Sequence, residues 1–205
     1  MLFQTNLLSS LNSFRKCMLL PLSLAAVLFL SGCTNQGANQ NLASSMTSIP
    51  PSQGVVVIGL KGNAAGTFRR GVYSDEGSFE HDTARDAAFS APSSEPYIVQ
   101  AMNITSDKSR YGMYQATLGG REYSFKCGQV LPVISVASNA AQYYGDFEVT
   151  ISSGRLTVKQ SFDLERAQSY IDSAYPLSGW KLEPGKVVRA RSTNCVSVPP
   201  AAIVG

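Results

Sequence analysis

The sequence predicts an all-β fold: a two-layer antiparallel β-sandwich with one C-terminal helix. Three observations predict it. Two segments have the alternation and the central turn of a β-hairpin, one run has the composition of a buried strand, and one stripe of apolar residues has helical spacing. A hairpin with one apolar face buries that face only against a second layer. Two such hairpins, at residues 112–127 and 147–160, therefore indicate two facing sheets.

The first hairpin turns at Gly119-Gly120, a dipeptide that accepts the positive φ angles of a tight two-residue turn. This turn places one mostly apolar set of residues on one face and one mostly polar set on the other. The apolar face pairs Leu118 with Arg121, Ala116 with Tyr123, Tyr114 with Phe125 and Gly112 with Cys127, and the polar face pairs Thr117 with Glu122, Gln115 with Ser124 and Met113 with Lys126.

The second hairpin turns at Ser153-Gly154 and has an equally clear division of faces. Its apolar face pairs Ile151 with Leu156, Val149 with Val158 and Phe147 with Gln160. Its polar face includes Glu148 opposite Lys159, a cross-strand pair of opposite charge. A slip of one residue would mix the two sets, so the turn and the pattern predict the same register.

The other elements follow from local composition. Residues 55–60 form an apolar, β-branched run typical of a central strand that is buried on both faces. Further strands are expected at 67–73, 77–81, 97–104, 130–137 and 187–190, and Pro132 favours an edge or a bulge for the fourth of these. A helix is expected at 163–175, with Asp163 as N-cap and Pro176 after its end.

The N-terminus carries a targeting pattern. Residues 18–30 are uncharged, Arg15 and Lys16 precede them, and Leu30-Ser-Gly-Cys33 follows. The apolar run is short for a membrane-spanning helix and suits the core of a secretory signal, with an ordinary buried helix as the alternative. The small residues before Cys33 resemble the lipobox of bacterial lipoproteins. This resemblance implies a signal peptide at 1–32, a diacylglycerol and further acyl chains such as palmitate on Cys33, and a membrane anchor.

The domain boundaries follow from this assignment. Residues 34–53 are uncharged and rich in Asn, Gln, Ser and Ala, so 33–53 is predicted to be the lipidated cysteine with a disordered tether. Residues 54–205 are predicted to be the β-sandwich domain. Thr34, rather than an acidic residue, follows the cysteine. By resemblance to lipoprotein sorting signals, this implies the periplasmic face of the outer membrane, with retention at the inner membrane as the alternative.

The charge of the chain bears on its possible partners, and its cysteine content bears on its disulfide bonding. Removing residues 1–32 takes away Arg15 and Lys16 and leaves 15 basic and 14 acidic residues, a net charge of +1. A near-neutral chain gives no basis for nucleic-acid binding. Cys127 and Cys195 would remain in an oxidising compartment, where they predict one disulfide, with two separate buried thiols as the alternative.

No catalytic motif stands out in the chain, which lacks a GxSxG elbow, an HExxH pair and a P-loop. The one local cluster is Glu80-His81-Asp82, within a segment that reads as a solvated loop or a frayed helix end. We therefore expect no catalytic residue, no metal site and no cofactor, and a protein that is not an enzyme.

An aromatic cluster stands at the start of the second hairpin. Tyr143, Tyr144 and Phe147 are candidate partner-binding residues, with core packing at the end of the sandwich as the alternative interpretation. Trp180, which follows the helix, is predicted to pack between the helix and the sheet.

The segment 143–176 resembles a family of uncharacterised bacterial outer-membrane lipoproteins. Their pattern is a Tyr-x-Gly-Asp strand entry, then a short helix rich in Glu, Arg and Ala that ends in Tyr-Pro. The matching residues here are Tyr143, Gly145, Asp146, Glu165, Arg166, Ala167, Tyr175 and Pro176. The resemblance implies a prealbumin-like β-sandwich on a lipid anchor, and it brings no catalytic residues with it.

These features together predict a lipid-anchored envelope protein that acts as a non-enzymatic interaction module facing the periplasm. Its expected partners are the membrane, through the anchor, and an envelope protein that contacts an edge strand or the Tyr143 cluster. Two alternatives remain. One is an envelope inhibitor or small-ligand binder that uses a protruding loop in 61–95, and the other is a cell-wall-acting enzyme that uses His81 in a cleft.

Overall fold

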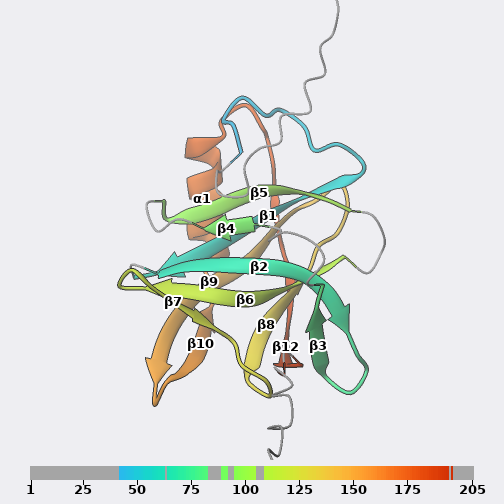
Figure 1. Ribbon diagram of the computed structural model, residues 1–205. Coiled ribbons are helices and arrows are strands. Elements are labelled where there is room, and N and C mark those ends of the chain that lie inside the picture. Colours follow the sequence, from blue (N-terminus) through green and yellow to red (C-terminus); the bar gives the residue numbers. More distant parts are fainter. Residues whose placement is uncertain are drawn as a thin grey trace, which may run out of the picture. The chain divides into compact units, whose positions relative to one another are not determined.

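The computed structural model describes residues 42–62, 64–82, 89–91, 95–104, 109–193 and 195. This part of the chain is mostly β-structure with a single helix, so the predicted all-β class is confirmed (Figure 1). The elements are β1 (Gln53–Lys61), β2 (Ala64–Tyr73), β3 (Ser78–His81), β4 (Phe89–Ala91), β5 (Tyr97–Asn103), β6 (Arg110–Leu118), β7 (Arg121–Ser124), β8 (Val130–Ser135), β9 (Ala141–Ser152), β10 (Arg155–Ser161), α1 (Leu164–Ala174), β11 (Leu182–Pro184) and β12 (Lys186–Ser192).

The first sheet has the strand order β10-β9-β1-β5, and β11 lies beside the start of β9. β1 is central, as predicted. It is antiparallel to β5 and parallel to β9, and Val55, Val56, Val57 and Ile58 are all fully buried. Valine and isoleucine can face a packed layer on both sides of a strand, which explains the unbroken apolar run.

The second sheet has the order β4-β2-β3-β12-β8-β6-β7, and β2 also pairs with β6. This extra pairing closes β2, β3, β12, β8 and β6 into a small barrel. The predicted antiparallel two-layer sandwich is therefore wrong in its connections, because β1–β9, β9–β11 and β3–β12 are parallel and one sheet closes on itself. Hairpin patterns report only neighbours in sequence, whereas parallel pairs join distant segments. A prealbumin-like sandwich is not confirmed.

The core has two parts, one on each face of the first sheet. The larger lies between this sheet and the barrel and includes Ile58, Met113 and Phe147. The smaller lies between the sheet and α1 and includes Val57, Tyr143 and Ile171. Figure 1 shows the resulting layers, with α1 on one side of β1 and β5 and the barrel strands on the other.

The first hairpin has its predicted turn and register next to that turn. Leu118 pairs with Arg121 and Gln115 with Ser124, as expected. The Phe125 N–H donates to the Tyr114 carbonyl at 3.0 Å, which agrees with the predicted pairing of these two residues. The prediction is wrong at the far end, because Gly112 pairs with Val133 of β8 instead of with Cys127. A β-bulge in β6 also shifts the faces: between Gln115 and Met113 the register with β2 skips one residue. Met113, predicted on the polar face, is therefore fully buried.

The second hairpin matches its prediction at every pair from Ser152–Arg155 to Phe147–Gln160. Leu156, Val158 and Val149 are buried against the barrel, while the opposite face is exposed. The strands also place Lys159 opposite Glu148, as expected. Both turn residues have positive φ, 50° at Ser153 and 73° at Gly154, as a type I′ turn requires.

The strand containing Pro132 is interior rather than at an edge, contrary to expectation. β8 lies between β12 and β6, and Pro132 is opposite Arg189 of β12. On its other side, β8 pairs with β6 only through Val133, Ile134 and Ser135, so Pro132 lies just beyond the end of that pairing. The proline, which has no N–H to donate, therefore sits where one neighbouring strand has already diverged.

The helix matches its prediction. Asp163 caps α1 by accepting a hydrogen bond from the Arg166 backbone N–H at 3.1 Å, and Tyr175 is the C-cap before Pro176. Ala167 and Ile171 bury the apolar stripe against the first sheet. Trp180 packs beside it, with its ring stacked on Tyr175, as predicted. Among the described residues no helix is long and apolar enough to span a membrane.

The packed part of the chain begins earlier than the predicted boundary at residue 54. Leu42 is buried, its N–H donates to the Val99 carbonyl at 2.8 Å, and its carbonyl accepts from the Tyr175 hydroxyl at 3.1 Å. Met46 and Ile49 pack on the same cluster. The predicted disordered tether is therefore wrong for residues 42–53, because three spaced apolar side chains fit beside α1. Residues 33–41 lie outside the described part.

Candidate functional site

The aromatic cluster predicted as a contact surface lies in the interior. Tyr143, Tyr144 and Phe147 are all fully buried, so none of them presents its ring to a partner. Tyr143 faces α1, while Tyr144 and Phe147 face the barrel. The alternative interpretation, core packing, describes all three. The expectation that they form a partner-binding surface is wrong, because successive strand residues face two different buried layers.

A polar network joins this cluster to the helix. The buried Asp146 carboxylate accepts hydrogen bonds from the Tyr143 hydroxyl at 2.7 Å and from the Arg166 guanidinium. Arg166 also donates from Nε to the Tyr97 hydroxyl at 3.0 Å. Gly59 leaves the space for the carboxylate, since a Cβ there would lie 2.1 Å from Asp146 Oδ1. The network ties β9 and β5 of the first sheet to the first turn of α1, and Gly59 of β1 leaves room for it.

The electrostatics of this network suit a structural clamp. Burial, and then the hydrogen bond to Asp146, raise the pKa of Tyr143 well above its usual value. Burial likewise raises the pKa of Tyr97, and the Tyr97 hydrogen bond and the Asp146 charge raise the pKa of Arg166. The two hydroxyls therefore stay protonated and the guanidinium stays charged near neutral pH, so neither tyrosine supplies a base or a nucleophile.

His81 also lies in a packed interior. The strand expected at 77–81 is confirmed as β3, whereas the solvated loop or frayed helix end expected around His81 is wrong, because this side chain is only 3% exposed. Its ring packs edge-on against Phe79 and Tyr114, with centroid separations of 4.9 and 5.2 Å. Within the described chain, no group of three or more His, Cys, Asp or Glu side chains is arranged to hold a metal ion.

The two cysteines predicted to pair are brought together. The sulfur atoms of Cys127 and Cys195 lie 1.98 Å apart, across a sequence separation of 68 residues. The bridge joins the loop after β7 to the end of β12, and backbone hydrogen bonds support the same loop: Gly128 donates to Ser192 and Ser192 to Gln129, both at 2.8 Å. Cys33, the predicted lipid-bearing residue, lies outside the described residues.

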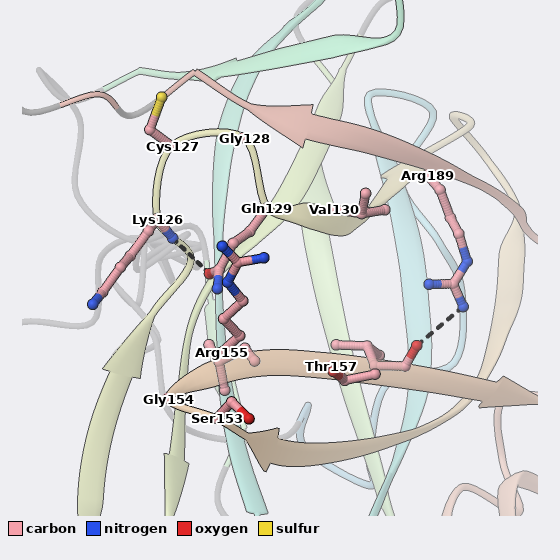
Figure 2. A pocket seen from close by; sticks show the side chains of 12 residues that line it. Lys126, Cys127, Gly128, Gln129, Val130, Ser153, Gly154, Arg155, Thr157 and Arg189 are labelled. Atoms are coloured by element: carbon pink, nitrogen blue, oxygen red, sulfur yellow. Dashed lines mark hydrogen bonds between the residues drawn. The ribbon is translucent and has the colours of Figure 1, made fainter.

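A groove opens beside this disulfide, between the β9–β10 hairpin of the first sheet and β8 and β12 of the barrel (Figure 2). We call it the basic groove. Its volume is about 780 Å³. It is lined by Lys126, Cys127, Gly128, Gln129, Val130, Ser153, Gly154, Arg155, Leu156, Thr157, Val158 and Arg189.

Three cations from three separate elements line the basic groove. Lys126 comes from the β7–β8 loop, Arg155 from the hairpin and Arg189 from β12. In Figure 2, Arg155 reaches from the hairpin towards Gln129, while Arg189 descends from β12 towards Thr157. The lining contains no carboxylate, and within the described part of the chain none of the three cations forms an ion pair.

The same groove exposes the outer edge of the first sheet. β10 is the last strand in the order β10-β9-β1-β5, so among the described strands only β9 pairs with it. The Arg189 guanidinium crosses the groove and donates to the Val158 carbonyl at 3.1 Å. Gln129 holds the facing loop by accepting from the Lys126 N–H at 2.8 Å.

Sequence reasoning missed the basic groove. The hairpin register placed Arg155 next to the turn, but nothing in the sequence put Arg189 or Lys126 beside it, because their proximity depends on barrel closure. The even spread of charge along a chain of net charge near zero also gave no signal. The one available clue was the free second side of the predicted 155–160 strand.

No protein-family model, curated protein or solved structure matches this chain.

Proposed function

We propose that this protein is a non-enzymatic interaction module of the bacterial cell envelope, anchored by lipid on Cys33, and that it binds an anionic partner in the basic groove. One observation carries the binding proposal: Lys126, Arg155 and Arg189 line one groove that contains no carboxylate. A groove with charge of one sign attracts the opposite charge even when the whole chain is close to neutral.

Charge pairing elsewhere in the molecule supports this choice of site. Arg166 is satisfied by a buried carboxylate and by a tyrosine hydroxyl. Arg189 instead donates a hydrogen bond to a neutral carbonyl, that of Val158, and Arg155 points into the opening. A guanidinium presents a planar set of donors that suits carboxylates and phosphates, so these two arginines are available to an external anion.

The envelope location is proposed from the lipobox-like sequence before Cys33 and from Thr34 after it, which favour the periplasmic face of the outer membrane. Leu42, the first described residue, follows Cys33 by nine positions. A fully extended chain of that length spans at most about 30 Å. The packed domain is then held within a short reach of the bilayer, where other envelope proteins are its nearest partners.

The alternatives have less support in the described chain. An inhibitor role would use a protruding loop in 61–95, but residues 64–73 and 78–81 of that range are barrel strands. An enzyme role would use His81 in a cleft, but that side chain is buried between aromatic rings. We propose a binding role because the basic groove brings Lys126, Arg155 and Arg189 together in a lining that has no carboxylate.

Binding of an acidic peptide to the purified mature lipoprotein in neutral detergent tests the proposal. A fluorescent poly-glutamate peptide should bind at low salt, and affinity should fall as salt rises. The Arg155→Gln/Arg189→Gln variant should bind about tenfold more weakly, which is about 0.7 kcal/mol for each charge. Arg121→Gln/Lys181→Gln, which removes the same charge outside the groove lining, is the matched control. Equal loss in both variants would contradict the proposal.

A further inference from the structure

β10 exposes a regular row of backbone hydrogen-bonding groups. The type I′ turn makes Ser152 and Arg155 a hydrogen-bonded pair, and such pairs alternate along an antiparallel ladder. Leu156, Val158 and Gln160 therefore direct their N–H and C=O groups away from β9. The bond from Arg189 to the Val158 carbonyl agrees with this direction. The row faces the basic groove, which Leu156 and Val158 line.

The opposite edge of the same sheet, unlike β10, is covered by another part of the chain. β5 is the other terminal strand, and the chain itself covers it: the Leu42 N–H donates to the Val99 carbonyl, and Leu42 is held by Tyr175. In the described residues no comparable segment covers β10. An uncovered edge strand is a template for another extended chain, unless charge or shape prevents pairing.

The charges beside β10 select what can pair with it. Arg155 and Lys159 project from β10, and Arg189 reaches across the groove, while Lys126 lies at its margin with the ammonium directed outward (Figure 2). Pairing with β10 of a second copy would bring like charges together, which disfavours self-association. An extended segment with acidic side chains on one face would place carboxylates beside these cations instead.

We infer that the anionic partner of the basic groove is an extended acidic polypeptide segment that adds to the first sheet as a strand next to β10. The inference rests on the proposed function and names its partner class. The backbone of Leu156 and Gln160 and the Val158 N–H would supply the pairing, and Arg155, Arg189 and Lys126 the preference for acidic side chains. Strand addition of this kind gives affinity through main-chain bonds and specificity through alternate side chains.

Amide hydrogen exchange of the mature lipoprotein, measured by NMR, tests the pairing. The probe is a peptide of about eight residues that alternates glutamate and valine, close to a typical strand length. Saturating peptide should slow exchange at Leu156, Val158 and Gln160 by about tenfold or more. Thr157 and Lys159, whose amides already face β9, serve as internal controls with little change. Slow exchange at the first three amides without peptide would mean that the edge is already covered, which would overturn the inference.

N-methylated versions of the peptide distinguish strand pairing from binding by charge alone, because methylation leaves the charge of the peptide unchanged. Methyl groups on alternate amides that face β10 should weaken binding by about tenfold or more, because they remove the donors of the shared ladder. Methyl groups on the other amides should leave binding nearly unchanged. Equal affinity of the two methylated peptides would overturn strand addition.

The outcomes separate this inference from the proposed function. If the peptide binds and the Arg155→Gln/Arg189→Gln variant loses it, but the β10 amides do not change, the groove binds anions without strand pairing. If phosphatidylglycerol vesicles protect the groove and the peptide does not bind, the partner is a membrane surface and the inference is wrong. If neither binds, both the inference and the proposed function fail.

Discussion

The Asp146 carboxylate accepts a hydrogen bond from the Tyr143 hydroxyl three residues earlier on the same strand, and a bulge makes this possible. In a regular strand these two residues would face opposite sides. Gly145 has φ of 93° and lies where the β1–β9 register shifts, between the pairs Val57–Tyr143 and Gly59–Asp146. The extra residue turns both side chains towards α1 and returns Phe147 to the main core.

The Asp146–Arg166 pair should contribute measurably to stability. Arg166→Gln leaves the buried carboxylate without its cation and should lower the free energy of unfolding by about 2 kcal/mol, less than a fully buried pair because the arginine is largely exposed. Urea unfolding measures the change. Adding Asp146→Asn to this variant should recover part of the loss, because no uncompensated charge then remains. A strictly additive double variant would show that the two residues do not act as a pair.

The N-terminal segment should be part of the folded unit rather than a free linker. Leu42→Ala removes a buried side chain at the end of the packed chain and should cost about 2 kcal/mol, at the low end for such changes because the segment can fray. Leu177→Ala, at a position 67% exposed, is the matched control and should cost little. Thermal unfolding of both variants gives the comparison. Similar stability of the two variants would place Leu42 outside the cooperative fold.

The Cys127–Cys195 bridge should stabilise the fold and shape the basic groove. A bridge over 68 residues is worth about 4 kcal/mol in the chain-entropy model. The Cys127→Ala/Cys195→Ala variant should unfold at correspondingly lower urea. It should also bind the acidic peptide less tightly, because the loop that carries Lys126 loses its tie to β12. Two reactive thiols in the oxidised, denatured protein would show that the bridge does not form.

Alkaline pH should destabilise the protein through its buried tyrosines. Burial, followed by the Glu95 charge, raises the pKa of Tyr170 to about 12, and burial raises the pKa of Tyr175 to about 12. The unfolded chain loses these protons near its ordinary tyrosine pKa of 10.0, so it binds fewer protons than the folded chain between pH 10 and 12. This stabilisation is complete below pH 10 and is lost as the pH rises towards 12.

Absorbance at 295 nm, which follows tyrosinate, checks this directly. The native protein should titrate later than the urea-unfolded protein, and Tyr170→Phe should remove one of the late-titrating groups. Between pH 10 and 12 the free energy of unfolding should fall less steeply with pH in Tyr170→Phe, by the slope that corresponds to about one proton. Coincident titration of the native and unfolded protein would contradict the assignment.

The anchor prediction is tested by Cys33→Ser. If Cys33 carries the lipid, this variant should leave the membrane fraction, because the acyl chains supply the membrane affinity. Immunoblots of separated inner-membrane, outer-membrane and soluble fractions measure the distribution. Unchanged membrane association of the variant would contradict lipid anchoring, and wild-type protein in the inner membrane would contradict the proposed sorting.

The sequence predicted local elements well and long-range connections poorly, for physical reasons. Turn residues and two-residue alternation determine a hairpin locally, so the β9–β10 register was predicted in full. The extra residue of the β6 bulge, Tyr114, is not a glycine, and the face of Met113 was therefore assigned wrongly. Barrel closure through β2–β6 and the parallel β3–β12 pair join segments that share no local signal.

The same reasons explain what was missed at the candidate site. The aromatic residues at 143–147 drew attention because they are rare side chains close together, yet large aromatic side chains are more often core than surface. The basic groove combines Arg155 and Arg189 with a loop lysine. Their meeting is a property of the three-dimensional fold, whereas the disulfide that borders the groove followed from cysteine count and compartment.

Site-specific photocrosslinking in the native envelope tests the central claim most directly. A photoreactive side chain at Thr157, inside the basic groove, should capture one abundant envelope polypeptide through an acidic segment. The adduct should disappear in the Arg155→Gln/Arg189→Gln background, and a probe at Val72, which is 72% exposed on the barrel, should not form it. An adduct from Thr157 that survives loss of both arginines, or no enrichment over Val72, would contradict the proposal that this groove is the binding site.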